Sequence, residues 1–139
     1  MKAAYLLGRL GFGSYFLYSG IHHFRHTGPL AAYAGGKKVP APAMAVRLTG
    51  AALALGGASI ILGLKPHWGA AAVIAFLAGV SPVMHDFWRR EEAGERQTEM
   101  VNFSKNMALL AAAMMVSGME RARTEEAAQV GSGLGSRAA

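Results

Sequence analysis

The chain contains no cysteine. This absence excludes a disulfide, a thiolate nucleophile and a cysteine metal site, and with them the dithiol chemistry that some membrane oxidoreductases perform. Charge is also scarce, because only 16% of the 139 residues are charged whereas 53% are hydrophobic. A chain of this length is one domain, and its composition lies on the apolar side of the soluble average. A membrane protein is therefore the first class to test.

The apolar residues form four blocks that charged segments separate. These blocks cover residues 4–24, 43–64, 68–84 and 103–119. A helix needs about 20 mostly apolar residues to span the hydrocarbon core. The first two blocks reach this length, and the other two reach it if their helices extend into neighbouring polar residues. We therefore predict an all-α fold, a four-helix transmembrane bundle with short loops, in residues 1–119, followed by a polar C-terminal tail in residues 120–139.

A soluble helical bundle would need a polar stripe along each helix. The stretches "LTGAALALGGASIILGL" and "WGAAAVIAFLAGV" are apolar all round and have no such stripe. The first block carries an arginine and no convincing cleavage site, so we expect it to stay as a membrane anchor. The net charge of +6 is scattered through short loops. This pattern favours the lipid bilayer, with its anionic headgroups, over nucleic acid as the partner.

Small residues recur at helical spacing in three of the blocks, at Gly8 and Gly11, at Gly50, Ala54 and Gly57, and at Ala72, Ala75 and Gly79. Such faces let helix backbones approach closely in lipid, so we expect them to pack. Arg9 and Arg47 lie within a turn or two of the block ends. A charge at a helix centre costs roughly 2.5–3.5 kcal/mol on insertion scales. We expect both arginines to reach lipid headgroups or to hold an anion, either a lipid phosphate or Asp86.

Three histidines, His22, His23 and His26, form an HHxxH pattern at the end of the first block. His22 and His26 have the i,i+4 spacing that could share a metal ion. The block carries no acidic residue and the chain has no HExxH motif, so we predict no metal site. A haem or chlorophyll ligand from His22, His23 or His85 is chemically possible, but one imidazole per helix specifies no such cofactor.

The third block leads into "MHDFWRR". In a helix Asp86 would reach Arg89 and Arg90 at i+3 and i+4, with the acid in the favoured N-terminal position. The aromatic pair Phe87 and Trp88 fits the belt at the membrane surface. These features describe a helix that leaves the membrane.

Polar residues at the start of the fourth block lie at the same membrane level. A helical hairpin would place His85 and Asp86 opposite Lys105 and Asn106. These four residues are the candidate site, since a quinone carbonyl needs a hydrogen-bond donor and a proton route.

The order of "LGRLGFGSYFLYSGIHHF", "TGAALALGGASIILGLKPHWGA", "MHDFWR" and "NFSKNMALLAAAM" resembles the DoxX family of small four-helix membrane proteins. The resemblance spans about residues 7–119 and includes Val39-Pro40 and Gly56-Gly57. Some members carry a glutamate in the second helix, where this chain has Leu53 and other apolar or small residues. The resemblance implies a link to membrane redox systems, which include a subunit of a thiosulfate:quinone oxidoreductase.

Three hypotheses follow. The first is a non-catalytic accessory or scaffold subunit of a larger membrane redox complex, which binds lipid or quinone at its interfaces in the bacterial inner membrane. The second is a quinone-linked oxidoreductase subunit with its polar site at His85, Asp86, Lys105 and Asn106. The third is a subunit that binds haem or chlorophyll.

Overall fold

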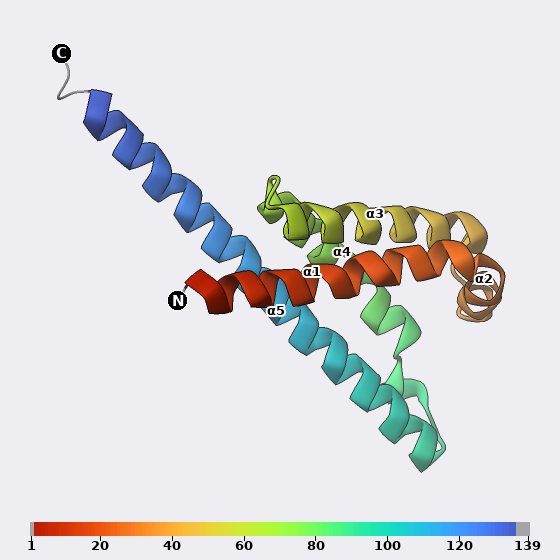
Figure 1. The fold of residues 1–139 in the computed structure, drawn as a ribbon. Coiled ribbons are helices and arrows are strands. Elements are labelled where there is room, and N and C mark those ends of the chain that lie inside the picture. The colour runs from red at the N-terminus through yellow and green to blue at the C-terminus, as the bar shows by residue number, and fades with distance from the viewer. Residues whose placement is uncertain (1, 136–139) are drawn as a thin grey trace.

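A computed structural model describes residues 2–135 and is helical nearly throughout (Figure 1). The elements in chain order are α1 (Lys2–Arg25), α2 (Thr27–Gly36), α3 (Pro42–Leu62), α4 (Pro66–Met84), the single 3-10 turn η1 (Phe87–Arg89) and α5 (Ala93–Gly135). The all-α prediction is confirmed. The described part contains five α-helices where the sequence predicted four, because the segment expected to be a linker after α1 folds into the short helix α2.

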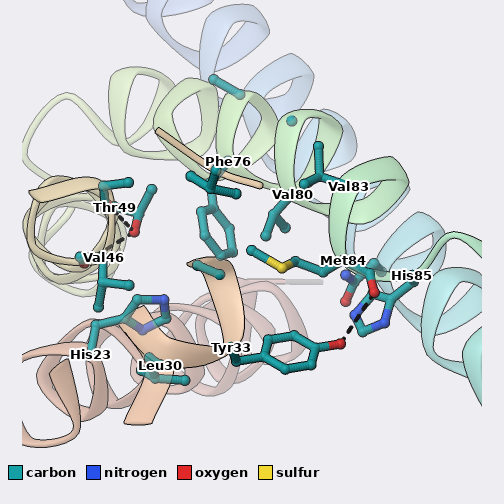
Figure 2. A pocket seen from close by; sticks show the side chains of 16 residues that line it. His23, Leu30, Tyr33, Val46, Thr49, Phe76, Val80, Val83, Met84 and His85 are labelled. Atoms are coloured by element: carbon teal, nitrogen blue, oxygen red, sulfur yellow. Dashed lines mark hydrogen bonds between the residues drawn. The ribbon is translucent and has the colours of Figure 1, made fainter. Parts of the chain in front are cut away.

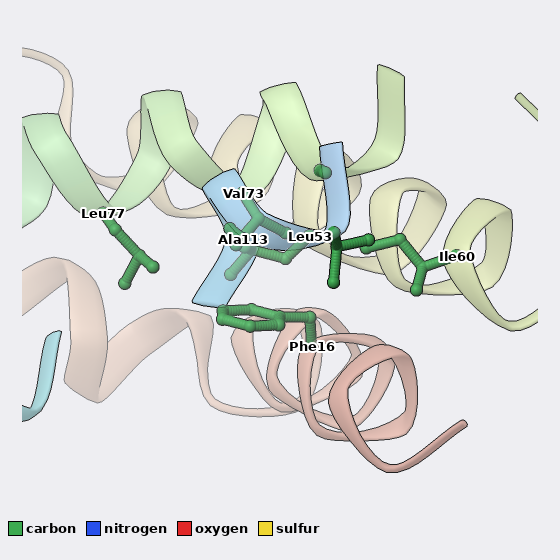
Figure 3. Packing of buried hydrophobic residues seen from close by; sticks show 8 residues of the cluster. Phe16, Leu53, Ile60, Val73, Leu77 and Ala113 are labelled. Atoms are coloured by element: carbon green, nitrogen blue, oxygen red, sulfur yellow. The ribbon is translucent and has the colours of Figure 1, made fainter. Parts of the chain in front are cut away.

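Helix α3 lies between α1 and α4, and α2 packs across the N-terminal part of α3. Helix α5 packs on α4, crosses the other helices obliquely and extends beyond them at its C-terminal end (Figure 1). Buried apolar side chains from α1, α3, α4 and α5 form one core cluster (Figure 3). Phe16, Leu53, Ile60 and Val73 are its largest fully buried members. All four long helices therefore share one core.

Glycines bring α1 and α3 into backbone contact. A Cβ atom added at Gly20 would lie 2.4 Å from the backbone nitrogen of Ala54, and one added at Gly57 would lie 2.4 Å from that of Leu17. The predicted packing of Gly50 and Gly57 is confirmed, since both face the backbone or side chains of α1.

The same expectation is wrong for Gly8, Gly11 and Gly79. A Cβ atom at any of these three positions would meet nothing within 4 Å. Helical spacing identifies a shared face, but it does not say whether a neighbouring helix covers that face.

The exit from α4 differs from the expected continuous helix. Helix α4 ends at Met84, two residues after Pro82, and the chain passes through η1 before α5 begins at Ala93. Pro82 removes the backbone donor that would reach the Ala78 carbonyl, and the buried Ser81 hydroxyl donates to the neighbouring Leu77 carbonyl. The break therefore lies before Gly94, which is itself inside α5.

The polar tail predicted to follow residue 119 continues as part of α5 as far as Gly135, and residues 136–139 lie outside the described part. Helix α5 also begins well before the polar residues where the fourth block was expected to start.

Two described segments are long and apolar enough to cross a membrane, Pro42–Leu62 and Pro66–Arg89. The sequence predicted four spans, and the other two long helices, α1 and α5, carry more charged and polar residues. Large apolar side chains are nevertheless exposed along the long helices, with Leu7 70% and Leu55 72% accessible. Exposed apolar surface on this scale is typical of a membrane or protein interface.

Candidate functional site: a polar cluster beside an apolar cavity

Asp86 holds two basic side chains. Its Oδ1 lies 2.7 Å from Lys37 Nζ and 2.6 Å from Arg90 Nη2, and the Asp86 side chain is 15% exposed. The contact with Arg90 at i+4 was predicted, although the intervening residues form a 3-10 turn and not an α-helix. The Asp86 carboxylate also holds the pKa of Arg90 above its usual value, chiefly by accepting its hydrogen bond.

Lys37 was missed as a partner of Asp86, because the contact joins residues 49 positions apart. A signal for it was nevertheless present: no acidic residue precedes Asp86 in the chain. Every basic residue before Asp86, including Lys37, therefore has no carboxylate closer in sequence.

His85 is connected to α5 by a contact that sequence reasoning also missed. Its Nδ1 lies 2.8 Å from Glu99 Oε2, and both side chains are about four-fifths shielded from solvent. A carboxylate accepts hydrogen bonds, so Nδ1 is the protonated nitrogen of His85 in this contact. The pair fastens the end of α4 to α5.

The predicted group of four polar residues is divided in the structure. His85, Lys105 and Asn106 line one open hollow, together with Tyr15 and Asn102. Asp86 does not line this hollow, and its carboxylate contacts Lys37 and Arg90. The structure thus brings together three of the predicted residues and separates the fourth.

A second cavity, of about 470 Å³, lies between α2, α3 and α4, and we call it the α2 cavity (Figure 2). Its walls are mainly apolar, and it shares His85 and Asn106 with the open hollow. The lining residues are His23, Leu30, Tyr33, Ala34, Val39, Ala45, Val46, Thr49, Ala75, Phe76, Gly79, Val80, Val83, Met84, His85 and Asn106. This cavity was not predicted from the sequence, because α2 was not expected to be a helix.

The HHxxH histidines separate into two environments. His22 and His26 stack on each other with ring centroids 4.1 Å apart. His23 instead lines the α2 cavity, with its Nδ1 2.8 Å from the Ser19 carbonyl oxygen and its ring edge-on to Phe76. Within residues 2–135, no group of three or more histidine, aspartate or glutamate side chains is arranged to hold a metal ion.

The two arginines expected to hold an anion have different environments. Arg9 Nη1 lies 3.7 Å from Glu120 Oε1, and its guanidinium approaches Gly63 in the turn between α3 and α4. Arg47 is exposed on α3. Asp86 was expected as a partner for either arginine, and it is instead bound by Lys37 and Arg90.

Comparison with known proteins gives one match. A family model described as DoxX matches residues 4–86, which is more than half of the chain. No curated protein and no solved structure matches the chain.

Proposed function

This chain belongs to the DoxX family of membrane proteins, and we propose that it is a non-catalytic accessory subunit of a larger membrane redox complex. In this proposal α1, α3, α4 and part of α5 form a four-helix transmembrane bundle in a bacterial inner membrane. The subunit would bind lipid or quinone at its interfaces.

The observation that carries the accessory role is that two ionisable groups of the candidate site, Asp86 and His85, already bind other charged groups. Asp86 is held by Lys37 and Arg90, and His85 is held by Glu99. These contacts join α2, the α4 exit and α5, so they stabilise the arrangement of these helices. A group used in this way is less free to take up or deliver a proton during a reaction.

The exposed apolar side chains support the membrane bundle. They occur on α1 and α5, at positions such as Leu7 and Met115, as well as on α3. Lipid solvates such side chains without cost, whereas glycine contacts of the kind between α1 and α3 supply the close packing that helices need in a bilayer.

Purification from native membranes in a mild detergent tests the accessory role. We expect larger redox proteins to co-purify with the chain, as identified by mass spectrometry. A chain that emerges alone and stable would contradict this proposal.

A quinone-linked oxidoreductase subunit is the second candidate. The open hollow favours it, because His85, Lys105 and Asn106 meet there beside Tyr15. Hydrogen-bond donors from Lys105 and Asn106 could engage a quinone carbonyl at this place.

The substitution Lys105→Met separates the two candidates, because Lys105 lines the open hollow and Asp86 does not. In an accessory subunit it leaves the turnover of each assembled complex intact. In a catalytic subunit assembly survives and quinone reduction collapses. Lys38→Met, at an exposed position outside the hollow, is the matched control.

A further inference from the structure

We propose that the α2 cavity is a binding site for one lipid-soluble aromatic alcohol, the chemical class to which the reduced form of a membrane quinone belongs. This inference rests on the membrane location proposed above, because the ligand would enter from lipid. It concerns a different place from the open hollow, which the cavity adjoins through His85 and Asn106.

The size and walls of the cavity suit a flat apolar molecule. Its volume of about 470 Å³ lies within the range of roughly 300–1,000 Å³ for small-molecule sites. Phe76 and Tyr33 contribute aromatic rings to the walls, and aliphatic side chains of α3 and α4 contribute most of the remaining surface (Figure 2). An aromatic ring can stack or pack edge-on against such side chains.

The cavity is accessible from outside. Tyr33 on α2 and Val83 on α4 both line it, and they are 49% and 42% exposed. A bilayer around the helices would cover these side chains, so a molecule dissolved in lipid could reach the opening.

The two cavity histidines indicate the polar group of the ligand. The Ser19 carbonyl oxygen can only accept a hydrogen bond, so His23 Nδ1 carries the hydrogen in their 2.8 Å contact. The same reasoning gives His85 a protonated Nδ1 beside Glu99. In a neutral ring the remaining nitrogen, Nε2, has no hydrogen and acts as an acceptor.

The hydroxyl donors of the cavity are already used. Thr49 donates to the Ala45 carbonyl at 2.8 Å, and Tyr33 donates to the Met84 carbonyl at 3.3 Å (Figure 2). The Asn106 amide supplies the remaining free donors, and the acceptors outnumber it around the cavity. A ligand that supplies an O–H group pairs with the histidine acceptors, whereas an aprotic carbonyl compound leaves them without a donor.

A pair of probes that differ only in this group provides the test. The purified chain in lipid nanodiscs is titrated anaerobically with decylubiquinol and with decylubiquinone, and empty nanodiscs give the background. We expect the quinol to bind more tightly by about 2- to 10-fold, which corresponds to one net hydrogen bond. His23→Phe keeps a ring against Phe76 and should reduce this preference, because it removes one of the two histidine acceptors. The control His22→Phe, at a position that does not line the cavity, should retain it.

Filling the cavity tests its location. A side chain at Gly79 would enter open space at a cavity-lining position, so Gly79→Leu should weaken quinol binding at least about tenfold. Gly11→Leu introduces the same side chain at an open position on α1 that does not line the cavity, and it should bind like the parent chain.

Equal affinities for the quinol and the quinone would overturn the inference, as would identical binding by the Gly79→Leu and Gly11→Leu proteins. A phospholipid that stays bound in native mass spectrometry and that the quinol cannot displace would also overturn it. These readouts use the isolated chain, so failure of the accessory role in co-purification leaves them unaffected.

Discussion

At the scale of single residues, the contact between Lys37 and Asp86 fastens the end of α2 to the exit of α4. Both side chains are more than four-fifths shielded, at 13% and 15% exposure. We expect Lys37→Met to lower the free energy of unfolding by about 1 kcal/mol. This value lies between the stabilisation from an exposed ion pair and that from a shielded hydrogen bond to a charged group. Titration with SDS in mixed micelles, followed by circular dichroism, measures this change.

Lys38→Met is the matched control, since Lys38 is the exposed neighbour of Lys37. It should change stability by less than about 0.5 kcal/mol. Equal losses for the two variants would show that the Lys37 contact with Asp86 does not hold α2 in place.

The same residues show which contacts sequence can predict. The pair of Asp86 with Arg90 follows from a spacing of four positions, and it survives although the local helix type differs. The contacts of Asp86 with Lys37 and of His85 with Glu99 depend on how separate elements meet. Helical spacing cannot predict such contacts, because the path of the chain between the two elements is not known from the sequence.

At the scale of elements, the interface of α1 with α3 depends on glycine. At Gly20 a methyl group would collide with the α3 backbone, so we expect Gly20→Ala to destabilise the protein by about 1–3 kcal/mol, the usual cost of overpacking. At Gly11 the added methyl group meets nothing, and Gly11→Ala should stabilise the helix by up to about 1 kcal/mol. The same SDS titration compares them, and a stabilising Gly20→Ala would refute this packing.

The start of α5 depends on pH through Glu92. Its carboxylate accepts hydrogen bonds from the backbone N–H groups of Glu95 and Gly94, and these bonds lower its pKa below the usual 4.5. Because the folded pKa is depressed, this stabilisation is fully present above the unfolded pKa and is lost as the pH falls through the folded value.

Amide hydrogen exchange at Gly94 and Glu95 measures this effect. Protection, after correction for intrinsic exchange rates, should fall as the Glu92 carboxylate is protonated. In Glu92→Gln, whose amide oxygen accepts at any pH, that dependence should disappear. A variant that retains the full pH dependence would assign it to another group.

Helix α2 shows why one element escaped prediction. Its sequence "TGPLAAYAGG" contains glycine and proline and lies between the first two apolar blocks, where a loop was expected. Pro29 lies in the first turn, where a backbone N–H has no partner within the helix and proline is tolerated. The packing of α2 on α3 then compensates for its weak intrinsic preference.

At the scale of the whole molecule, residues from several helices meet at each of the two ends of the bundle. Arg9 near the start of α1 meets Gly63 in the turn between α3 and α4, and it also meets Glu120 of α5. The opposite end holds α2 and η1, which the Lys37 contact with Asp86 joins. If the bundle spans the membrane, Lys65 and Lys38 lie on opposite sides.

The absence of cysteine makes this topology directly measurable. A single Lys65→Cys or Lys38→Cys chain carries one thiol, and the parent chain serves as the unlabelled control. We expect a membrane-impermeant maleimide to label only one of the two in intact cells and the other only in inverted vesicles. Labelling of both from the same side would contradict a four-span arrangement.

Helix α5 has 43 residues, which at 1.5 Å each gives about 65 Å, twice the thickness of a hydrocarbon core of about 30 Å. It contains no proline, and near its crossing with α1 Glu120 meets Arg9 while Arg123 lies over the Tyr5 ring. A partner protein that binds α5 beyond Glu120 and changes its tilt would therefore also move the first half of the same rigid helix. That half carries Glu99, which contacts His85, and Asn106, which lines the α2 cavity.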